Sequence, residues 1–282
     1  MRDGFVKVAA VTPKIRVADT EYNANIICDY ITEAADAGAK VIVFPELAIT
    51  GYTCGDLFIQ EVLLEGARDA LLKIAGYSSD VDALIFVGLP LSCNGKLYNT
   101  AAAINRGEIL GFVPKTYLPT YNAFYEARHF ARGMEEPAEV DFAGKKLPIG
   151  TKLLFSCADM PELKIGVEIC EDLWTPEPPS IRHARNGATV IVNLSASNET
   201  TGKDVYRRDL VNGQSARLLC GYLYASAGDG ESTQDVVYSG HDLIAENGRM
   251  LVESKRFTVG VTTAEIDVRR SRAFGDGGRC AG

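Results

Sequence analysis

Three polar residues follow apolar, strand-like runs, and together they could attack a carbonyl carbon. Glu46 follows "VIVFP", Lys115 follows "ILGFVP", and Cys170 follows "IGVEI". Side chains from distant parts of a chain often meet in one pocket at the ends of strands. A thiol attacks as the thiolate, so it needs a base for its proton and a cation for the charge that develops. Glu46 could serve as this base, Lys115 as the cation and Cys170 as the nucleophile.

The acids around Cys170 present a difficulty, because negative charge keeps a thiol protonated. Glu168 precedes the cysteine, and Glu171 and Asp172 follow it. Successive residues of a strand point to opposite faces, so these acids need not oppose the reaction. A sharp turn after Cys170 would also direct Glu171 and Asp172 away from the sulfur.

Each of the three residues also has an ordinary interpretation. A cysteine that ends an apolar strand is usually a small buried hydrophobe, a Pro-Glu pair is usually a loop acid, and Val-Pro-Lys is usually an exposed strand end. The combination of all three, in the order Glu, Lys, Cys, favours the catalytic interpretation.

The elements that must position these residues alternate between strands and helices. A helix is expected from Asp19 or Thr20 to about Gly38, because apolar residues recur there at helical spacing. Further helices are expected at residues 56–75, 180–188 and 204–219. Strands are expected at residues 7–13, 39–46, 82–91, 164–170, 189–197, 221–228 and 257–267, and hairpins at 97–115 and 241–254. A long polar and aromatic loop is expected at 116–133. Two halves of similar order predict an α/β protein, with sheets inside and helices outside.

Composition limits the classes of function. The 282 residues are 46% hydrophobic and 23% charged, and their net charge of −8 argues against a nucleic-acid binder, which would need a basic face. No apolar run is long enough for a membrane span or a signal peptide, so a cytoplasmic location without membrane contact is expected. The seven cysteines form no CxxC pair, and the three histidines show no metal-ligand spacing, so no metal site is expected.

Three blocks of the sequence resemble the signature blocks of the nitrilase (carbon–nitrogen hydrolase) superfamily. They are "FPELAITGYTCGDLF", "GFVPKTYLPTYNAFYEARHF" and "GVEICEDLW", within a resemblance from "KVAAVTP" to "TTAEID". The resemblance implies a four-layer α-β-β-α sandwich. It also implies that Glu46 is the general base, Lys115 stabilises the tetrahedral intermediate and Cys170 is the nucleophile. Glu126 matches a second glutamate that positions the lysine and the substrate amide.

More narrowly, "EICEDLW", "NLSASNE" and "YLYASAGDGESTQDVVYSGHDLIAENG" resemble the glutaminase domain of glutamine-dependent NAD synthetases. Such domains release ammonia from glutamine and pass it through a tunnel to a C-terminal synthetase domain. The resemblance implies a glutamine pocket that includes Tyr52, Tyr121, Glu126, Trp174 and Ser197. For Tyr52 and Tyr121, packing in the rim of the pocket is an equal alternative.

The resemblance divides the chain into a glutaminase domain at residues 1–268 and the start of a linker at 269–282. No SGGxDS-like run occurs, so the expected ATP and Mg²⁺ belong to a synthetase domain outside this sequence, and no cofactor is expected on this chain. The implied partners are glutamine, that synthetase domain and further copies of the chain. Two alternatives stay open: a stand-alone amidase for an ω-amide, carbamoyl or nitrile substrate, and a non-catalytic binding module.

Overall fold

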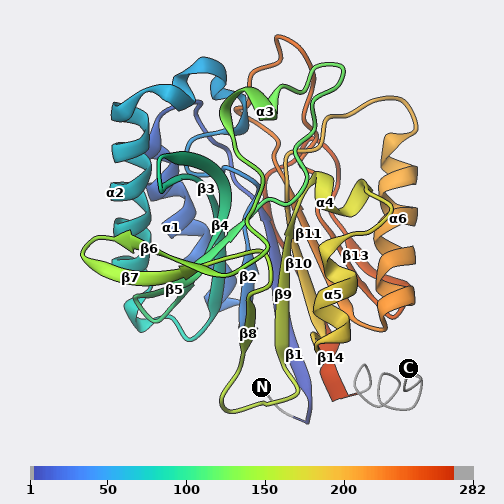
Figure 1. Ribbon diagram of the computed structural model, residues 1–282. Coiled ribbons are helices and arrows are strands. Elements are labelled where there is room, and N and C mark those ends of the chain that lie inside the picture. Colours follow the sequence, from blue (N-terminus) through green and yellow to red (C-terminus); the bar gives the residue numbers. More distant parts are fainter. Residues whose placement is uncertain (1–2, 270–282) are drawn as a thin grey trace.

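The computed structural model describes residues 3–269 and contains two mixed sheets (Figure 1). The first sheet has the strand order β14-β1-β2-β3-β4-β5-β7-β6. Its strands are β1 (Phe5–Thr12), β2 (Val41–Val43), β3 (Leu84–Cys93), β4 (Lys96–Asn105), β5 (Glu108–Pro114), β6 (Ala138–Phe142), β7 (Lys145–Ile149) and β14 (Gly260–Asp267).

The second sheet has the order β13-β12-β11-β10-β9-β8. Its strands are β8 (Leu154–Ser156), β9 (Lys164–Ile169), β10 (Val190–Ser195), β11 (Gly221–Ser226), β12 (Leu243–Glu246) and β13 (Arg249–Glu253). The central strands β9, β10 and β11 are parallel and almost entirely buried, as expected for strands covered on both faces.

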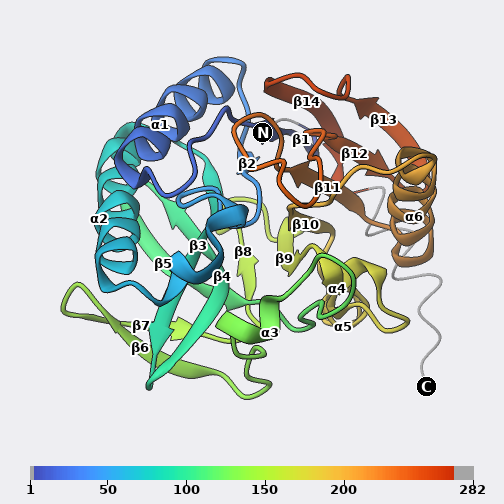
Figure 2. The same ribbon diagram turned by 90° about the horizontal axis from the view of Figure 1, so that it is seen from above.

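Helices cover the outer face of each sheet (Figure 2). Helices α1 (Thr20–Asp36) and α2 (Glu61–Tyr77) lie on the first sheet, and α5 (Pro179–Arg185) and α6 (Lys203–Leu218) lie on the second. Short helices are η1 (Tyr52–Ile59), η2 (Ser78–Asp80), α3 (Glu126–His129) and α4 (Glu171–Trp174). A separate apolar core fills the space between the sheets. The predicted four-layer α-β-β-α sandwich is therefore confirmed.

Helix α1 shows how local sequence sets an element. The side chain of Asp19 accepts a hydrogen bond from the Tyr22 N–H, which caps the helix as predicted. Ala24, Ile27 and Ile31 are fully buried, so the apolar stripe packs on the sheet. None of the helices within residues 3–269 combines the length and apolar character needed to cross a membrane.

One expected element begins later in the structure, and three short strands were not expected. The helix expected at residues 56–75 begins only at Glu61, because the preceding residues form the 3₁₀ segment η1. Gly55 interrupts this segment with φ of 56° and ψ of −133°, a conformation that favours glycine. The short strands β6, β7 and β8 were not predicted at all.

Strand direction brings the candidate residues to one end of the sandwich. Strands β2 and β3 are parallel, and β5 runs in the same direction because β4 is antiparallel to both β3 and β5. Glu46 and Lys115 therefore follow strands that point the same way. The N–H of Glu46 donates a hydrogen bond to Ser195 O of β10 at 3.4 Å, which joins this end to the second sheet. In that sheet, β9 leads directly into Cys170.

A buried aspartate also connects the two sheets. Asp242 is 1% exposed and accepts hydrogen bonds from the Thr12 hydroxyl of β1 at 2.9 Å and the Ser226 N–H of β11 at 3.0 Å. Burial raises the pKa of Asp242 to about 7, although these two hydrogen bonds oppose the shift.

This pKa predicts a pH-dependent stability. Because the folded-state pKa of Asp242 is raised, its stabilising contribution is complete below the unfolded pKa near 3.8 and is lost as pH rises through about 7. The Asp242→Asn variant has no ionisable side chain at position 242. Its unfolding temperature should therefore change less than that of the wild type between about pH 5 and pH 8. Thermal unfolding of both proteins at constant ionic strength measures this difference, and equal changes would contradict the prediction.

Candidate active site

Glu46 lies just beyond β2 and is 1% exposed. Its Oε1 accepts hydrogen bonds from Lys115 Nζ at 2.6 Å and from Asn99 Nδ2 at 2.7 Å. Its Oε2 accepts the Ala196 N–H at 3.0 Å. A buried carboxylate with donors from both sheets has a fixed orientation, as a general base requires.

Lys115 lies between two carboxylates. Its side chain is fully buried, and Nζ is 2.6 Å from Glu46 Oε1 and 2.5 Å from Glu126 Oε1. The Tyr52 hydroxyl donates to the same oxygen of Glu126 at 2.8 Å. Among the described residues, no group donates a hydrogen bond to Glu126 Oε2, although this atom is buried. The site therefore has one buried cation and one carboxylate oxygen free to accept a hydrogen bond.

Cys170 occupies a sharp turn between β9 and α4. It is 8% exposed, with φ of 43° and ψ of −98°, which is unusual for a residue with a side chain. Its N–H is held by Leu194 O at 3.0 Å and Asn193 Oδ1 at 3.2 Å. A strained residue persists only where its surroundings hold it firmly, and such positions are frequent at active sites.

The acids near Cys170 occupy three different environments. Glu168 accepts hydrogen bonds from the Tyr222 hydroxyl and, at 2.9 Å, from the Ser180 N–H of α5. Glu171 accepts the hydroxyl of Tyr121 at 2.9 Å and is half-buried.

Asp172 is buried and accepts backbone N–H groups instead of side-chain donors. All three acids thus have hydrogen-bond donors of their own, which allows them to lie near the thiol.

The charges in the site keep the thiol protonated at rest. Burial and the carboxylate of Glu46 raise the pKa of Cys170 above its usual range, and Lys115 opposes the shift. Burial lowers the pKa of Lys115, but Glu126 and Glu46 outweigh it and hold this pKa well above its ordinary value. Burial also raises the pKa of Glu126 to about 7. The thiol, the lysine and both glutamates therefore form one electrostatic cluster, as the order Glu, Lys, Cys predicts.

The residues expected in a substrate pocket lie around this cluster. Tyr52 contacts Glu126 directly, whereas Tyr121 is half-exposed and contacts Glu171. Ser197 is buried and lies 3.5 Å from an Arg207 nitrogen. Trp174 packs on Tyr206, and Lys203 Nζ lies 5.0 Å from the centre of the Trp174 ring.

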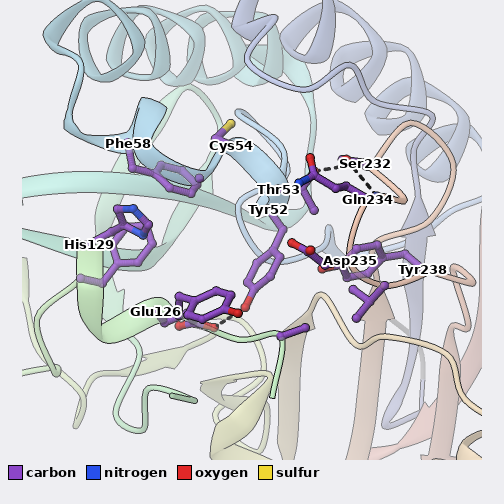
Figure 3. Close-up of a pocket in the computed structure, with 15 residues that line it drawn as sticks. Tyr52, Thr53, Cys54, Phe58, Glu126, His129, Ser232, Gln234, Asp235 and Tyr238 are labelled. Atoms are coloured by element: carbon purple, nitrogen blue, oxygen red, sulfur yellow. Dashed lines mark hydrogen bonds between the residues drawn. The ribbon is translucent and has the colours of Figure 1, made fainter. Parts of the chain in front are cut away.

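A cavity of about 350 Å³ lies beside the cluster (Figure 3). Tyr52 and Glu126 form one wall, and η1, α3 and residues 232–238 supply the others. Cys170, Tyr121, Trp174 and Ser197 do not line this cavity. It therefore meets the site at the Tyr52–Glu126 hydrogen bond rather than at the sulfur.

Three further residues complete the site and were not expected as members of it. Asn99 holds Glu46, and its signal is a polar residue inside the apolar run "LYNTAAAI". Lys203 begins α6, where a positive charge is unfavourable for the helix dipole and so suggests another role. Asp172 was noticed only as a charge near the thiol. Among residues 3–269, no group of three or more His, Cys, Asp or Glu side chains could hold a metal ion.

Comparison with known proteins gives consistent matches. The family model for carbon-nitrogen hydrolase matches residues 7–275. A glutamine-dependent NAD(+) synthetase of Mycobacterium tuberculosis is 45% identical over 265 residues, which are 94% of this chain and 39% of that protein. The chain spans about two fifths of the length of the curated relatives it matches, at their N-terminal part.

Solved structures give the same result. A glutamine-dependent NAD(+) synthetase from Cytophaga hutchinsonii has a TM-score of 0.83 at 30% identity, over 94% of this chain and 43% of that one. A mutant amidase of the nitrilase superfamily from Nesterenkonia has a TM-score of 0.75 at 19% identity, over 99% of this chain and 96% of that one. The second similarity concerns the fold alone.

Proposed function

Because the chain belongs to the carbon–nitrogen hydrolase family, we propose that it hydrolyses the side-chain amide of glutamine to glutamate and ammonia through a thioester on Cys170. One observation carries the proposal: Lys115 Nζ lies 2.6 Å from a carboxylate oxygen of Glu46 and 2.5 Å from one of Glu126, close enough to the buried thiol of Cys170 for all three charges to influence its pKa. This arrangement supplies a base, a cation and a nucleophile at one point.

The first step is attack on the amide carbon. Glu46 takes the proton of Cys170 as the sulfur bonds to carbon, so no free thiolate accumulates at rest. The amide oxygen becomes an oxyanion, which Lys115 Nζ and the N–H of Glu171 stabilise. That N–H belongs to the first turn of α4, where backbone donors have no partner within the helix.

Glu126 orients the substrate amide in this proposal. Its Oε1 is occupied by Lys115 and Tyr52, whereas Oε2 has no donor among the described residues. A buried unpaired oxygen costs free energy until a donor arrives, so it favours an amide N–H over an ester or a carboxylate.

The second step releases the products. Glu46, now protonated, gives its proton to the leaving nitrogen, and ammonia departs as the C–N bond breaks. The same carboxylate then takes a proton from water, whose oxygen attacks the thioester carbon. The C–S bond breaks, the sulfur regains a proton, and glutamate is released.

Recognition of free glutamine needs opposite charges for its ammonium and carboxylate groups. Glu171 and Lys203 meet this need at the rim of the site. Burial lowers the pKa of Lys203, while the charges of Cys170 and Glu171 oppose the shift, so all three groups lie within electrostatic reach. We assign Glu171 to the ammonium and Lys203 to the carboxylate, with Tyr121 beside Glu171 and Trp174 beside Lys203. Ser197, which is buried next to Arg207, is the further residue proposed for this pocket.

Replacing Lys203 by methionine should weaken glutamine binding selectively. Loss of one charge-assisted hydrogen bond of about 1.5–3 kcal/mol corresponds to a KM for glutamine roughly 10- to 100-fold higher. Turnover of propionamide, which lacks the carboxylate, should stay within about twofold. The matched control is Lys40→Met, because Lys40 is a half-buried lysine paired with Asp82 outside the site. An equal effect on both substrates would contradict this assignment.

The proposed function is tested by ammonia release from glutamine, asparagine, propionamide and a carbamoyl amino acid. Glutamine should be the best substrate, and mass spectrometry of a rapidly quenched reaction should find a glutamyl adduct on the peptide that contains Cys170. Faster turnover of a short amide would indicate a stand-alone amidase instead. Absence of turnover and of adduct with every substrate would support a binding module.

The curated relatives are NAD synthetases, so we propose that the ammonia passes to a synthetase domain. ATP and Mg²⁺ would act in that domain, while hydrolysis would use the side chains described above. Association of several copies of the chain is part of the same proposal.

A further inference from the structure

The carboxylate of Asp172 joins the backbone next to Lys115 to the backbone next to Cys170. Its Oδ1 accepts the Tyr117 N–H at 2.8 Å and the Thr116 N–H at 3.1 Å. Its Oδ2 accepts the Ile169 N–H at 2.9 Å. Thr116 and Tyr117 directly follow the lysine, and Ile169 directly precedes the cysteine. One side chain therefore connects both halves of the site.

Regular backbone pairing ends at Lys115, which donates to Asn99 O at 2.8 Å, and at Cys170, which donates to Leu194 O at 3.0 Å. Strand β5 ends at Pro114, so Thr116 and Tyr117 lie beyond its ladder with β4. Strand β9 ends at Ile169, and Cys170 then adopts its left-handed conformation. Such a conformation costs roughly 1–3 kcal/mol in a residue with a side chain, so the neighbouring backbone must be held firmly.

The position of Asp172 is costly for the fold itself. The residue is 1% exposed, and burial raises its pKa to about 8, although the N–H groups of Ile169 and Tyr117 oppose the shift. No lysine or arginine forms an ion pair with it among residues 3–269. A buried carboxylate held by backbone donors alone gains the fold little stability, but its hydrogen bonds fix the positions of those donors relative to one another.

We propose that Asp172 is a positioning residue that sets the distance between Lys115 Nζ and the Cys170 sulfur. This inference rests on the proposed function, because it assigns the geometry that the hydrolysis needs. The side chain touches no substrate in this scheme and acts only through the two backbone segments. A displacement of about 1 Å between reacting groups can slow an enzyme roughly 10²-fold.

Asp242 provides a matched control elsewhere in the same fold. It is equally buried, its pKa is also raised by burial, and it also accepts a backbone N–H, that of Ser226. Its partners belong to β1 and β11 and do not adjoin Glu46, Lys115 or Cys170. The Asp242→Asn variant therefore reproduces the loss of a buried carboxylate without disturbing the site.

The test compares Asp172→Asn and Asp242→Asn with the wild type. Asparagine has one acceptor oxygen, so one of the two backbone segments loses its acceptor and faces an NH₂ group instead. In Asp172→Asn we expect kcat for glutamine to fall about 10- to 100-fold and KM to stay within about threefold. In Asp242→Asn we expect kcat within about twofold. Thermal unfolding measures the stability loss of each variant.

Alkylation of Cys170 by iodoacetamide separates this inference from the proposed function. The reaction needs Glu46 and Lys115 near the thiol but does not require glutamine to be the substrate. We expect slower alkylation of Cys170 in Asp172→Asn than in Asp242→Asn. If alkylation is slower in this way but the wild type shows no glutaminase activity, the proposed substrate is rejected and the positioning role is kept. If Asp172→Asn keeps the kcat and the alkylation rate of the wild type, the positioning role is overturned, whereas the proposed function is unaffected.

Hydrogen exchange in the wild type decides the question if Asp172→Asn does not fold. The amides of Thr116, Tyr117 and Ile169 should exchange at least about 100-fold more slowly than those of the exposed loop residues Thr120 and Tyr121. Equal exchange rates along this loop would show that Asp172 does not hold it and would overturn the proposal.

Discussion

Replacement of Cys170 by alanine is expected to reduce ammonia release from glutamine by roughly 10⁴-fold or more, to the limit of detection. The sulfur is the only protein atom in the proposed scheme that bonds to substrate carbon, so no other residue can substitute for it. Glu46, Lys115 and Glu126 stay in place, because none of their hydrogen bonds involves the thiol. Glutamine binding, measured by calorimetry, should therefore persist in the variant.

The matched control is Cys220→Ala. Cys220 is fully buried, and its pKa is also raised by burial, but the neighbouring charge is Glu168 rather than Glu46 or Lys115. We expect this variant to lose stability through a small cavity and to keep kcat within about twofold. Ammonia release that survives in Cys170→Ala, with loss of activity in Cys220→Ala, would reject the assignment of the nucleophile.

Local sequence was sufficient where neighbouring residues decide the structure. Asp19 and the spacing of Ala24, Ile27 and Ile31 predict α1 because a helix cap and an apolar stripe are local features. The same logic failed at residues 56–59, where apolar residues continue the helical pattern. There, Gly55 adopts a non-helical conformation that interrupts the pattern, and Asp56 pairs with Arg128 of α3, which is distant in sequence.

The candidate triad stays a prediction, and its members could be singled out from the sequence because each follows a buried strand. Parallel direction of β2, β3 and β5 follows from the order of elements, and it brings Glu46 and Lys115 to one end. The environments of the acids around Cys170 could not be predicted in the same way. They depend on donors from residues far along the chain, such as Tyr222 for Glu168 and Tyr117 for Asp172.

This separation of the acids explains how the proposed nucleophile can lie in an acidic segment. Glu168 has the Tyr222 hydroxyl and an N–H of α5 as donors, Asp172 has three backbone N–H groups, and Glu171 lies at the rim with Tyr121. Among the acids of residues 3–269, Glu46 and Glu126 alone form ion pairs with the buried Lys115. The charge that decides the state of the thiol is therefore set by three residues distant in sequence.

Lys115→Met is the second variant for which we expect a large effect. In the proposed mechanism it removes the cation that holds the oxyanion, so kcat for glutamine should fall roughly 10³-fold or more. It also leaves the carboxylates of Glu46 and Glu126 without the charge that now separates them. Breaking a buried ion pair in this way costs about 3–5 kcal/mol of unfolding free energy.

The pH dependence of that loss has a definite sign. Burial already raises the pKa of Glu126 to about 7, and removal of Lys115, which lowers this pKa, should raise it further. A carboxyl whose folded pKa is raised stabilises the fold at low pH, and this contribution disappears as pH rises through the folded pKa. Thermal unfolding should therefore find Lys115→Met closer to the wild type at about pH 5 than at about pH 8.

The double variant Lys115→Met with Glu126→Gln separates charge balance from catalysis. Removing both partners of a buried ion pair is often nearly neutral, so the double variant should recover much of the stability lost at about pH 8. It should not recover ammonia release, because the oxyanion still lacks its cation. Recovered activity would show that Lys115 serves the fold alone, whereas an unrecovered unfolding temperature would contradict the proposed repulsion between Glu46 and Glu126.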